Sequence, residues 1–371
     1  MDRGIQECRR RRGPGRPAPS RGEVPERGAG PRRAAEPSAA GEPVKEALAS
    51  VKATVFLPTL NGGAAFRRVL DALARQDAGF AYEVLVIDSG SRDGTDRAAA
   101  EAGARVISIP PEEFNHGRTR NRGIAEARGE FVALLTQDAE PADAHWLARL
   151  VEALEAVPDA AGAYCRQIPR PDCDPFVRDR LARWAATRTT RDVQEVPDPD
   201  AFWALPPLER LARIAFDNVA SCVRRSVMRD HPFPERPFGE DVAWSLEVLL
   251  GGRKIVYEPE AAVVHSHREG LWASFRRVYR DHRNLNDLLG ISLVPGFGDL
   301  LKNCWRGFGY YGGVVARTEG LTRWQRFGWR LYGGPYGSLQ VLAQYLGPRS
   351  NRWRRSSRLA RGLDRLIMGR G

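Results

Sequence analysis

The chain has 371 residues, 42% of them hydrophobic, which suffices for one large domain with appendages or for two domains. Its net charge of +11 is uneven: residues 1–49 carry +4, residues 50–300 carry −5 and residues 301–371 carry +12. A nucleic-acid-binding protein more often spreads its basic residues over the folded core. The pattern therefore argues against a nucleic-acid partner and favours an anionic ligand or membrane surface.

Residues 1–49 are rich in Pro, Gly, Ala and Arg and contain no apolar segment. We expect them to form a disordered basic tail rather than a secretory signal. No apolar run reaches the length of about 18 residues that a membrane-spanning helix needs. The five scattered cysteines form no Cys-X-X-Cys pair, so a disulfide framework is not expected and a reducing cytosol is favoured.

From residue 53 onwards, predicted strands alternate with predicted helices. The first helix carries apolar residues at helical spacing, for example Phe66, Val69 and Leu73. The FNHGRTRNRG segment (114–123) reads as a loop. This alternation predicts βαβ units and a mainly parallel, Rossmann-like sheet flanked by helices. In chain order the predicted elements are strand 53–57, a helix around 66–73, strand 83–88, helix 98–102, strand 105–109, helix 121–127, strand 131–135, helix 146–157 and strand 162–167.

The second half of the chain is less regular. Residues 169–200 are rich in proline and charge and predict an irregular lobe. A helix is expected at 242–250, strands at 254–257 and 262–264, and a helix at 271–289. We therefore expect a catalytic domain over 50–270 and a basic helical extension over 271–371.

Polar side chains follow several predicted strands at the point where each strand ends. Thr59, Asn61 and Asp88 follow the first two strands, and Asp138 follows the buried run 131–135. His265 and His267 follow the last strand, two residues apart and so on one face. Open α/β sheets bind ligands at this edge, and a lone carboxylate binds a hard cation well when phosphate oxygens complete the shell. Neither a GxGxxG turn after the first strand nor a P-loop motif is present.

With these residues in place, the chain resembles family 2 of the inverting glycosyltransferases of GT-A fold over residues 51–270, about 60% of its length. Within that family FNHGRTRN and TQDA resemble the rhamnosyltransferase branch, which uses dTDP-L-rhamnose. The motifs that carry the resemblance are VFLPTLNGG (55–63), VIDSGSRDGT (86–95), FNHGRTRNRG (114–123), LLTQDAEP (134–141), FGEDVAWS (238–245) and VVHSHREG (263–270).

The resemblance implies a donor-binding role for the polar groups of the first half of the domain. Asp88 would hydrogen-bond the pyrimidine base. The alternative is that Asp88 is an ordinary acid in a turn and does not contact a ligand. Arg118 and Arg120 would lie near the diphosphate, where a guanidinium binds phosphate oxygens as a fork. The alternative is that these two arginines belong to a basic loop that contacts only solvent. The full set of implied nucleotide-sugar-binding residues is Pro58, Thr59, Asn61, Asp88, Asp93, Arg118, Arg120, Asn121 and Gln137.

The resemblance also implies a metal site. Asp138 matches the last acid of the family's DxD-type motif, but the first acid is replaced in Thr136-Gln137-Asp138. His265 matches the second protein ligand best, with His267 as the alternative. The implied cofactor is Mg²⁺ or Mn²⁺, and an imidazole ligand suits Mn²⁺ better.

Asp241 is the implied general base, with Glu240 helping to orient the acceptor. Both acids also fit an ordinary role at a helix N-terminus. One displacement by the acceptor hydroxyl inverts the anomeric carbon, so a single base suffices, unlike the paired carboxylates of glycosidases.

Near the C-terminus, Leu359, Leu363, Leu366 and Ile367 recur at helical spacing among arginines such as Arg358. This pattern is typical of a helix that lies on an anionic membrane, although a soluble helix packed on the catalytic domain has the same pattern.

The sequence therefore predicts a metal-dependent glycosyltransferase that moves a sugar, L-rhamnose from dTDP-L-rhamnose, to a glycan or polyprenyl-diphosphate-linked acceptor in surface-polysaccharide synthesis. We expect it in the cytoplasm, peripheral on the inner membrane. The alternatives are a UDP-hexose donor, a catalytically silent sugar-nucleotide-binding protein and a polybasic adaptor.

Overall fold

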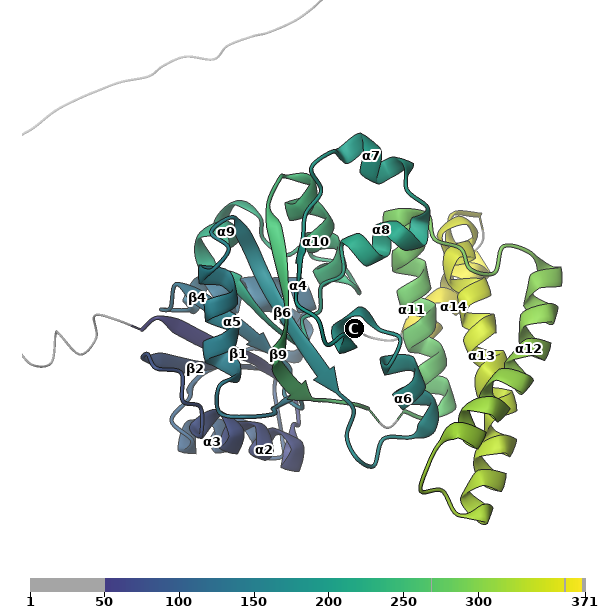
Figure 1. Cartoon of the computed structure of the whole chain (residues 1–371), viewed down its shortest axis with the longest axis horizontal. Coiled ribbons are helices and arrows are strands. Elements are labelled where there is room, and N and C mark those ends of the chain that lie inside the picture. Colours follow the sequence, from purple (N-terminus) through teal and green to yellow (C-terminus); the bar gives the residue numbers. More distant parts are fainter. Residues whose placement is uncertain (1–50, 268, 357, 369–371) are drawn as a thin grey trace, which may run out of the picture. The chain divides into compact units, whose positions relative to one another are not determined.

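The structure is a computed structural model that describes residues 51–267, 269–356 and 358–368. The predicted tail at 1–49 lies outside the described residues. Figure 1 shows a central sheet with helices packed against it, followed by a group of helices formed by the C-terminal residues. No helix among the described residues combines the length and apolarity needed to cross a membrane.

The described strands form one nine-stranded sheet in the order β3-β2-β1-β4-β8-β6-β9-β5, with β7 paired to β9. The pairs β1–β2, β1–β4 and β2–β3 are parallel, whereas β4–β8 and β6–β8 are antiparallel. The α/β fold is confirmed: its first half is a parallel sheet, and its second half is mixed. The strands are β1 Ala53–Thr59, β2 Tyr82–Asp88, β3 Arg105–Ser108, β4 Phe131–Leu135, β5 Glu140–Pro141, β6 Ala160–Ile168, β7 Asp192–Gln194, β8 Ala220–Arg224 and β9 Lys254–Val264.

Helices cover both faces of this sheet because alternate strand residues point to opposite faces. Val55 and Leu57 of β1 pack in one buried cluster with residues of α2, α3 and α5. Phe56 packs on the other side with residues of α4, α9 and α10. A Cβ added at Gly123 of α4 would lie 2.4 Å from the Phe56 ring, so only glycine lets this helix approach so closely. The bounds are α2 Gly63–Ala74, α3 Thr95–Glu101, α4 His116–Glu126, α5 Trp146–Glu155, α6 Pro175–Leu181, α7 Pro199–Ala204, α8 Pro207–Arg213, α9 Arg225–Asp230 and α10 Glu240–Leu250, with 3₁₀ turns η1 Pro111–Glu113 and η2 Ala185–Thr187.

Three expectations about local structure were wrong. Helix α4 begins at His116, not at 121, because the side chain of Asn115 accepts a hydrogen bond from the Arg118 amide and caps the helix. The predicted strands 254–257 and 262–264 are one strand, β9, which continues through Pro259 because β9 itself is irregular there: Glu258 and Ala262 pair with the consecutive β6 residues Cys165 and Arg166. The predicted irregular lobe at 169–200 contains α6, η2, β7 and the start of α7.

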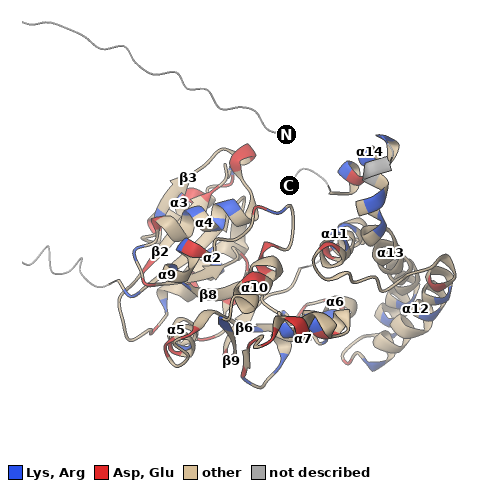
Figure 2. Cartoon of the chain, turned by 90° about the horizontal axis from the view of Figure 1, so that it is seen from above, with Lys and Arg blue, Asp and Glu red and all other residues tan. Residues whose placement is uncertain are grey.

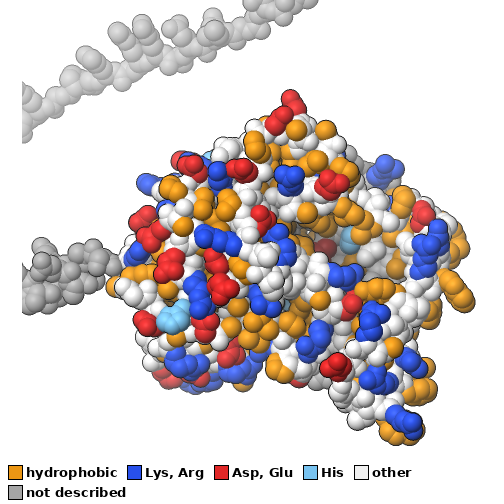
Figure 3. All heavy atoms as spheres, viewed as in Figure 1, with side chains coloured by type: hydrophobic (Ala, Val, Ile, Leu, Met, Phe, Trp, Pro, Cys, Tyr) orange, Lys and Arg blue, Asp and Glu red, His pale blue; other side chains and the backbone are white. Residues whose placement is uncertain are grey.

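The C-terminal residues form four helices, as expected for a helical extension: α11 Leu271–Leu289, α12 Phe297–Arg317, α13 Arg323–Ser356 and α14 Arg358–Met368. Figure 2 shows them side by side, with many basic residues. The Arg283 guanidinium of α11 binds the Asp364 carboxylate of α14 at 2.8 Å. Ile367 is buried with Phe275 of α11, so α14 packs on the protein through this side and exposes Leu359, Leu363 and Leu366 on the other. In Figure 3, basic and hydrophobic side chains are mixed over the region of α12 and α13.

Candidate active site

The loops that follow β1 and β2 are joined by hydrogen bonds at the carboxyl edge of the sheet. The Asn61 amide donates to the Ser91 hydroxyl at 2.8 Å, and the Gly63 amide donates to Asp93 at 3.0 Å. Asn61 adopts a left-handed backbone conformation (φ 48°) and accepts a hydrogen bond from the Arg92 amide through its side chain. The edge therefore has a fixed shape before any ligand arrives, with Asn61 and Asp93 exposed and Pro58 partly exposed upon it.

Asp88 is buried beneath this edge and is saturated by its own loop. Its carboxylate accepts hydrogen bonds from the Thr59 hydroxyl at 2.9 Å, from the Ser91 hydroxyl and from the amides of Gly90 and Ser91. A carboxylate has about four lone-pair positions, so these donors occupy them. Asp88 thus organises the loop, with Thr59 as its partner on β1, and a contact with the base stays a prediction.

The residues predicted on the FNHGRTRNRG loop lie on α4 and have protein partners. Arg120 is 5% exposed and forms a buried ion pair with Glu240. Arg118 is exposed and lies 3.7 Å from the Glu235 carboxylate. The Asn121 amide exchanges two hydrogen bonds with the Phe233 backbone. In the structure these side chains connect α4 to α10 and to the segment before it, and their donor-binding roles stay predictions.

Gln137 connects the end of β4 to the loop after β1. Its Oε1 accepts from the Leu60 amide at 2.9 Å and its Nε2 donates to the Leu60 carbonyl at 3.2 Å. This residue occupies the middle position of the DxD-type motif, between Thr136, which replaces the first acid, and Asp138. It holds the two loops together and leaves Asp138 as the carboxylate available beside it.

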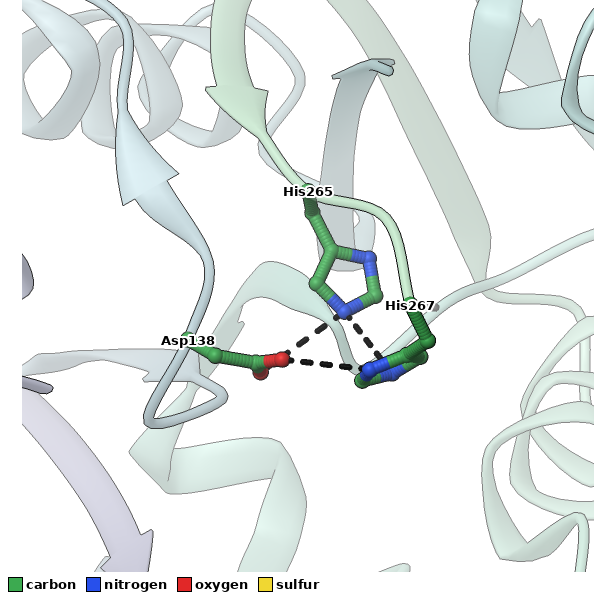
Figure 4. A group of neighbouring side chains, drawn as sticks. All are labelled: Asp138, His265 and His267. Atoms are coloured by element: carbon green, nitrogen blue, oxygen red, sulfur yellow. Dashed lines mark hydrogen bonds and ion pairs between the residues drawn. The ribbon is translucent and has the colours of Figure 1, made fainter. Parts of the chain in front are cut away.

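Asp138, His265 and His267 converge on one point (Figure 4). The His267 Nδ1 lies 3.3 Å from Asp138 Oδ2, and the His265 Nε2 lies 3.7 Å from Asp138 Oδ1. The two imidazoles approach at 3.1 Å between their Nε2 atoms. One atom from each residue lies within 4.8 Å of the others, which is compatible with a shared cation.

Hydrogen bonds behind His265 determine which ring nitrogen is free. Asp217 accepts from the Trp184 indole N–H at 2.9 Å, from the Val219 amide at 2.9 Å and from the Gln167 Nε2. With its NH₂ group facing Asp217, Gln167 turns its Oε1 toward His265 Nδ1 at 3.0 Å. The Nδ1 must therefore carry the proton and donate it, which leaves a lone pair on Nε2 facing Asp138.

The protonation of the two imidazoles also suits metal binding. Burial lowers the pKa of His265 to about 4, and it lowers the pKa of His267 as well. Both rings are therefore neutral at physiological pH, as a metal ligand must be. A carboxylate with two imidazoles is a donor set that fits Mn²⁺ and other divalent transition metals.

Gln167→Leu is expected to weaken Mn²⁺ binding by about 10- to 100-fold, because His265 would lose the partner that fixes its tautomer. The Mn²⁺ dissociation constant can be measured by electron paramagnetic resonance (EPR) of the free ion. Gln194→Leu is the matched control, since Gln194 is equally buried but lies on β7 and donates to the Arg213 carbonyl. Equal Mn²⁺ affinity of the two variants would contradict the role of Gln167.

Glu240 and Asp241 form the first turn of α10, and the shape of the chain at Gly239 places them there. Gly239 has φ 71°, and a Cβ at this position would lie 2.1 Å from the Asn284 side chain, so other residues are excluded. Burial raises the pKa of Glu240, but the charges of Arg120 and His116 and the hydrogen bonds to the carboxylate together outweigh burial, so the pKa is lowered. Glu240 is therefore an ionised partner of Arg120.

Asp241 has the opposite environment. Its Oδ2 lies 3.4 Å from the Asn218 amide, and its Oδ1 accepts from the Val242 amide at 2.8 Å. No basic side chain is paired with it in the described part of the chain. Burial raises its pKa to about 8, and the nearby Glu240 and Asp217 carboxylates add to the shift. A raised pKa in a carboxylate at the edge of the sheet is typical of a general base.

Two adjacent residues before β8 connect Asp241 to the cluster of Asp138, His265 and His267. Asp217 contacts Gln167 and thereby supports His265. Asn218 contacts both Asp241 and Glu240. The next residue, Val219, accepts from the Thr136 amide at the end of β4. Residues predicted from distant motifs are thus assembled around one short segment.

Comparison with known proteins identifies the family. Residues 54–224 match the family model of glycosyl transferase family 2. The O-antigen chain rhamnosyltransferase RfbN of Salmonella typhimurium is 30% identical over 62% of this chain and 71% of its own length. The O-antigen chain rhamnosyltransferase WbaN of Salmonella anatum is 27% identical over 61% of this chain and 70% of its own length. The chain belongs to glycosyl transferase family 2.

A solved structure agrees with the fold of this glycosyltransferase. The mannosyltransferase PcManGT of Pyrobaculum calidifontis, in complex with GDP-Man and Mn²⁺, covers 82% of this chain and 89% of its own, with a TM-score of 0.51 and 18% identity. At that identity the likeness concerns the fold alone. It supports the GT-A architecture expected from the sequence.

The glycosyltransferase also has cationic residues near the metal cluster that sequence reasoning missed. Arg170 donates to the Asp138 carbonyl at 2.6 Å. The charge of Arg277 lowers the pKa of both imidazoles, and Arg180 lowers that of His267. The Glu269 carboxylate lies 2.7 Å from Arg277. None of these arginines belongs to a motif used above, but Arg277 lies in the second turn of α11, nine residues after the HSHR segment, which was a usable signal.

Proposed function

We propose that this glycosyltransferase transfers L-rhamnose from dTDP-L-rhamnose to a glycan or polyprenyl-diphosphate-linked acceptor in cell-surface polysaccharide synthesis, with inversion. The relatives named O-antigen chain rhamnosyltransferases support the sugar and the acceptor class. The observation that carries the reaction is the arrangement around Asp217 and Asn218. It brings an Asp/His/His cluster and an unpaired carboxylate to one edge of the sheet.

Each side chain has one task in this reaction. Asp241 accepts the proton of the acceptor hydroxyl as that oxygen bonds to the anomeric carbon and the bond from this carbon to the diphosphate oxygen breaks. Asp138 with His265 and His267 would hold Mn²⁺ or Mg²⁺, whose charge stabilises the departing nucleotide diphosphate. Glu240 is neutralised by Arg120 and orients the acceptor side through α10 and Asn218.

The diphosphate needs additional cations, and we assign this role to Arg277 and Arg180 in place of Arg118 and Arg120. All four arginines have a carboxylate neighbour: Glu240 for Arg120, Glu235 for Arg118, and Glu269 for Arg277 and Arg180. The choice therefore rests on proximity to the candidate metal cluster. The Arg277 charge lowers the pKa of both imidazoles, and the Arg180 charge lowers that of His267. A guanidinium binds phosphate oxygens as a fork and remains charged when partly buried.

The pH dependence of the reaction follows from the raised pKa of Asp241. A base acts only when ionised, so kcat/KM should fall as the pH drops below about 8, by about tenfold per pH unit. An aspartate with an ordinary pKa of about 3.9 would lose activity only in much stronger acid. The measurement is kcat/KM against pH at saturating Mn²⁺ and constant ionic strength. A flat profile between about pH 5 and about pH 8 would contradict a base with a raised pKa at this site.

A panel of nucleotide sugars tests the donor. Purified protein with Mn²⁺ is combined with dTDP-L-rhamnose, UDP-glucose, UDP-GlcNAc and GDP-mannose, and thermal stabilisation and donor hydrolysis are measured. Stabilisation by dTDP-L-rhamnose alone is expected, and it should weaken in Arg277→Gln. Stabilisation by UDP-sugars alone would replace the donor with a UDP-hexose. Binding of a donor without hydrolysis or transfer would favour the catalytically silent alternative.

We also propose that the enzyme works at the cytoplasmic face of the membrane. The described cysteines Cys165, Cys173, Cys222 and Cys304 are all free thiols, which suits a reducing compartment. A sugar nucleotide and a lipid-linked acceptor would meet at this face.

A further inference from the structure

Helices α12 and α13 expose two apolar stripes that no described residue covers. On α12, the stripe residues recur at i, i+4, i+8 and i+11, so they lie on one side of the helix. On α13, they recur at i, i+3 and i+7. Trp305 and Trp324 are the most exposed of them, at 81% and 83%. The stripes consist of Phe297, Leu301, Trp305 and Phe308 on α12, and Trp324, Phe327 and Leu331 on α13. We name these seven residues the α12–α13 face.

The two helices are held together mainly by other residues. A Cβ at Gly337 of α13 would lie 2.7 Å from the Tyr311 ring of α12, and Val314 and Val315 of α12 are buried with Tyr336 of α13. Of the stripe residues, Phe308 takes part in this packing, since a Cβ at Gly334 would lie 2.4 Å from its ring. The other six stripe residues are not among these contacts, and the α12–α13 face is a preformed surface.

Another side of the hairpin faces the catalytic domain. Trp329 of α13 packs edge-on against Phe176 of α6, with ring centroids 5.6 Å apart. Trp329 and Tyr332 line a cavity of about 560 Å³ together with Glu269, which follows the metal-binding histidines by two residues. The α12–α13 face is thus separate from the side of α13 that lies beside the candidate active site.

The hairpin is basic. Residues 297–331 contain six basic side chains and two acidic ones, a net charge of +4. Lys302, Arg306, Arg317, Arg323 and Arg330 are exposed. Basic residues beside tryptophan and other large apolar side chains on an amphipathic helix are typical of a surface that lies in the interface of an anionic bilayer.

We propose that the α12–α13 face docks on an anionic lipid surface, with its apolar side chains in the headgroup region. Charge complementarity favours this occupant over two others. A second copy bound through the same face would set +4 against +4, which is unfavourable. The N-terminal residues 1–49 also carry +4 and would be repelled. Lipid docking at this face would bring the cavity beside Glu269 close to a membrane-bound acceptor.

This assignment differs from the one predicted from the sequence, which placed membrane contact at the C-terminal helix. Helix α14 exposes Leu359 and Leu366 but packs Ile367 and Asp364 against the protein. It offers one stripe of three leucines, whereas α12 and α13 together offer seven exposed apolar residues that include both of the most exposed tryptophans. An α14 variant therefore serves as a comparison in the experiment.

The test is flotation of the full-length protein with vesicles of phosphatidylcholine alone or mixed with phosphatidylglycerol, without donor. We expect binding to the anionic vesicles only, reduced at high salt. Trp305→Ser with Trp324→Ser should weaken binding by at least about tenfold, because each removes a large apolar side chain from the interface. The matched control is Trp203→Ser with Leu208→Ser, two exposed apolar residues on α7 and α8. It should bind like the wild type.

Several outcomes would overturn the proposal. Wild-type protein that stays unbound with anionic vesicles would exclude a lipid surface. Full binding by the Trp305/Trp324 variant, or loss of binding only in a Leu359→Ser, Leu366→Ser variant, would exclude this face. Light scattering that shows a dimer dissolved by the Trp305/Trp324 substitutions would make the face a contact between copies. Since the assay contains no sugar nucleotide, its result is independent of the proposed function.

Discussion

Asp241→Asn is expected to reduce kcat by about 10²- to 10⁴-fold, the usual contribution of a general base. The carboxylate in question lies in the first turn of α10, has a pKa raised to about 8 and has the Asn218 amide near it. An asparagine has nearly the same shape but cannot accept the proton. Binding of Mn²⁺ and of the nucleotide should be unchanged, because neither depends on this side chain. Turnover and donor binding can be measured on the same preparation.

The control for this substitution addresses the ordinary role of acids at a helix N-terminus. Asp96 lies in the first turn of α3, as Asp241 does in α10, but it is exposed and far from Asp241 in the sequence. Asp96→Asn should leave kcat unchanged. It should reduce the stability of its helix by the same small amount as Asp241→Asn, because both remove a negative charge from a helix N-terminus. If Asp241→Asn retained wild-type kcat, or lost donor binding together with turnover, Asp241 would not be the base.

Asp138→Asn should abolish the dependence on the divalent cation and reduce activity by roughly 100-fold or more, since a metal's charge at the leaving group is worth several kcal/mol. It removes the carboxylate of a cluster that otherwise contains two neutral imidazoles. Without this negative charge, bound Mn²⁺ should be undetectable by EPR at concentrations that saturate the wild type.

Asp143→Asn is the control for this experiment, because Asp143 lies in the same connection but points toward Arg149 at 2.7 Å. It should bind Mn²⁺ like the wild type. A Mn²⁺-dependent rate in Asp138→Asn equal to that of the wild type would place the cation elsewhere.

The sequence was sufficient to predict the parallel half of the sheet and its edge. Buried runs such as 131–135 and polar residues directly after them are local signals, and parallel strands bring their carboxyl ends to one side. Asp138 converges as expected with His265 and His267, which lie more than 120 residues further along the chain. The identity of the family followed from the spacing of motifs.

The residues that connect the parts of the site could not be predicted from the sequence. Gln167, Asp217 and Asn218 act through contacts that exist only because antiparallel β8 lies between β4 and β6, and β6 pairs with β9. The pairing of these strands leaves no local signal. The position of an antiparallel strand such as β8 within the sheet is determined by packing throughout the core.

A motif also could not distinguish a ligand-binding side chain from one with a protein partner. Arg120 and Asn121 stand where the resemblance implies contacts with the donor. The structure shows Arg120 paired with Glu240, and Asn121 bound to the backbone of Phe233. A buried charge needs a partner, and the sequence does not say whether that partner is a phosphate or a carboxylate 120 residues away.

Pulsed EPR of Mn²⁺ bound to the wild-type protein, with and without dTDP, tests the central claim most directly. If one edge of the sheet binds both a cation and a diphosphate, the bound Mn²⁺ should show nitrogen coupling from an imidazole, and this coupling should be lost in His265→Ala. Phosphorus coupling should appear once dTDP is added. Phosphorus coupling from Mn²⁺ that never shows a histidine nitrogen would mean that the cation arrives with the nucleotide and that the Asp138, His265 and His267 cluster does not hold it.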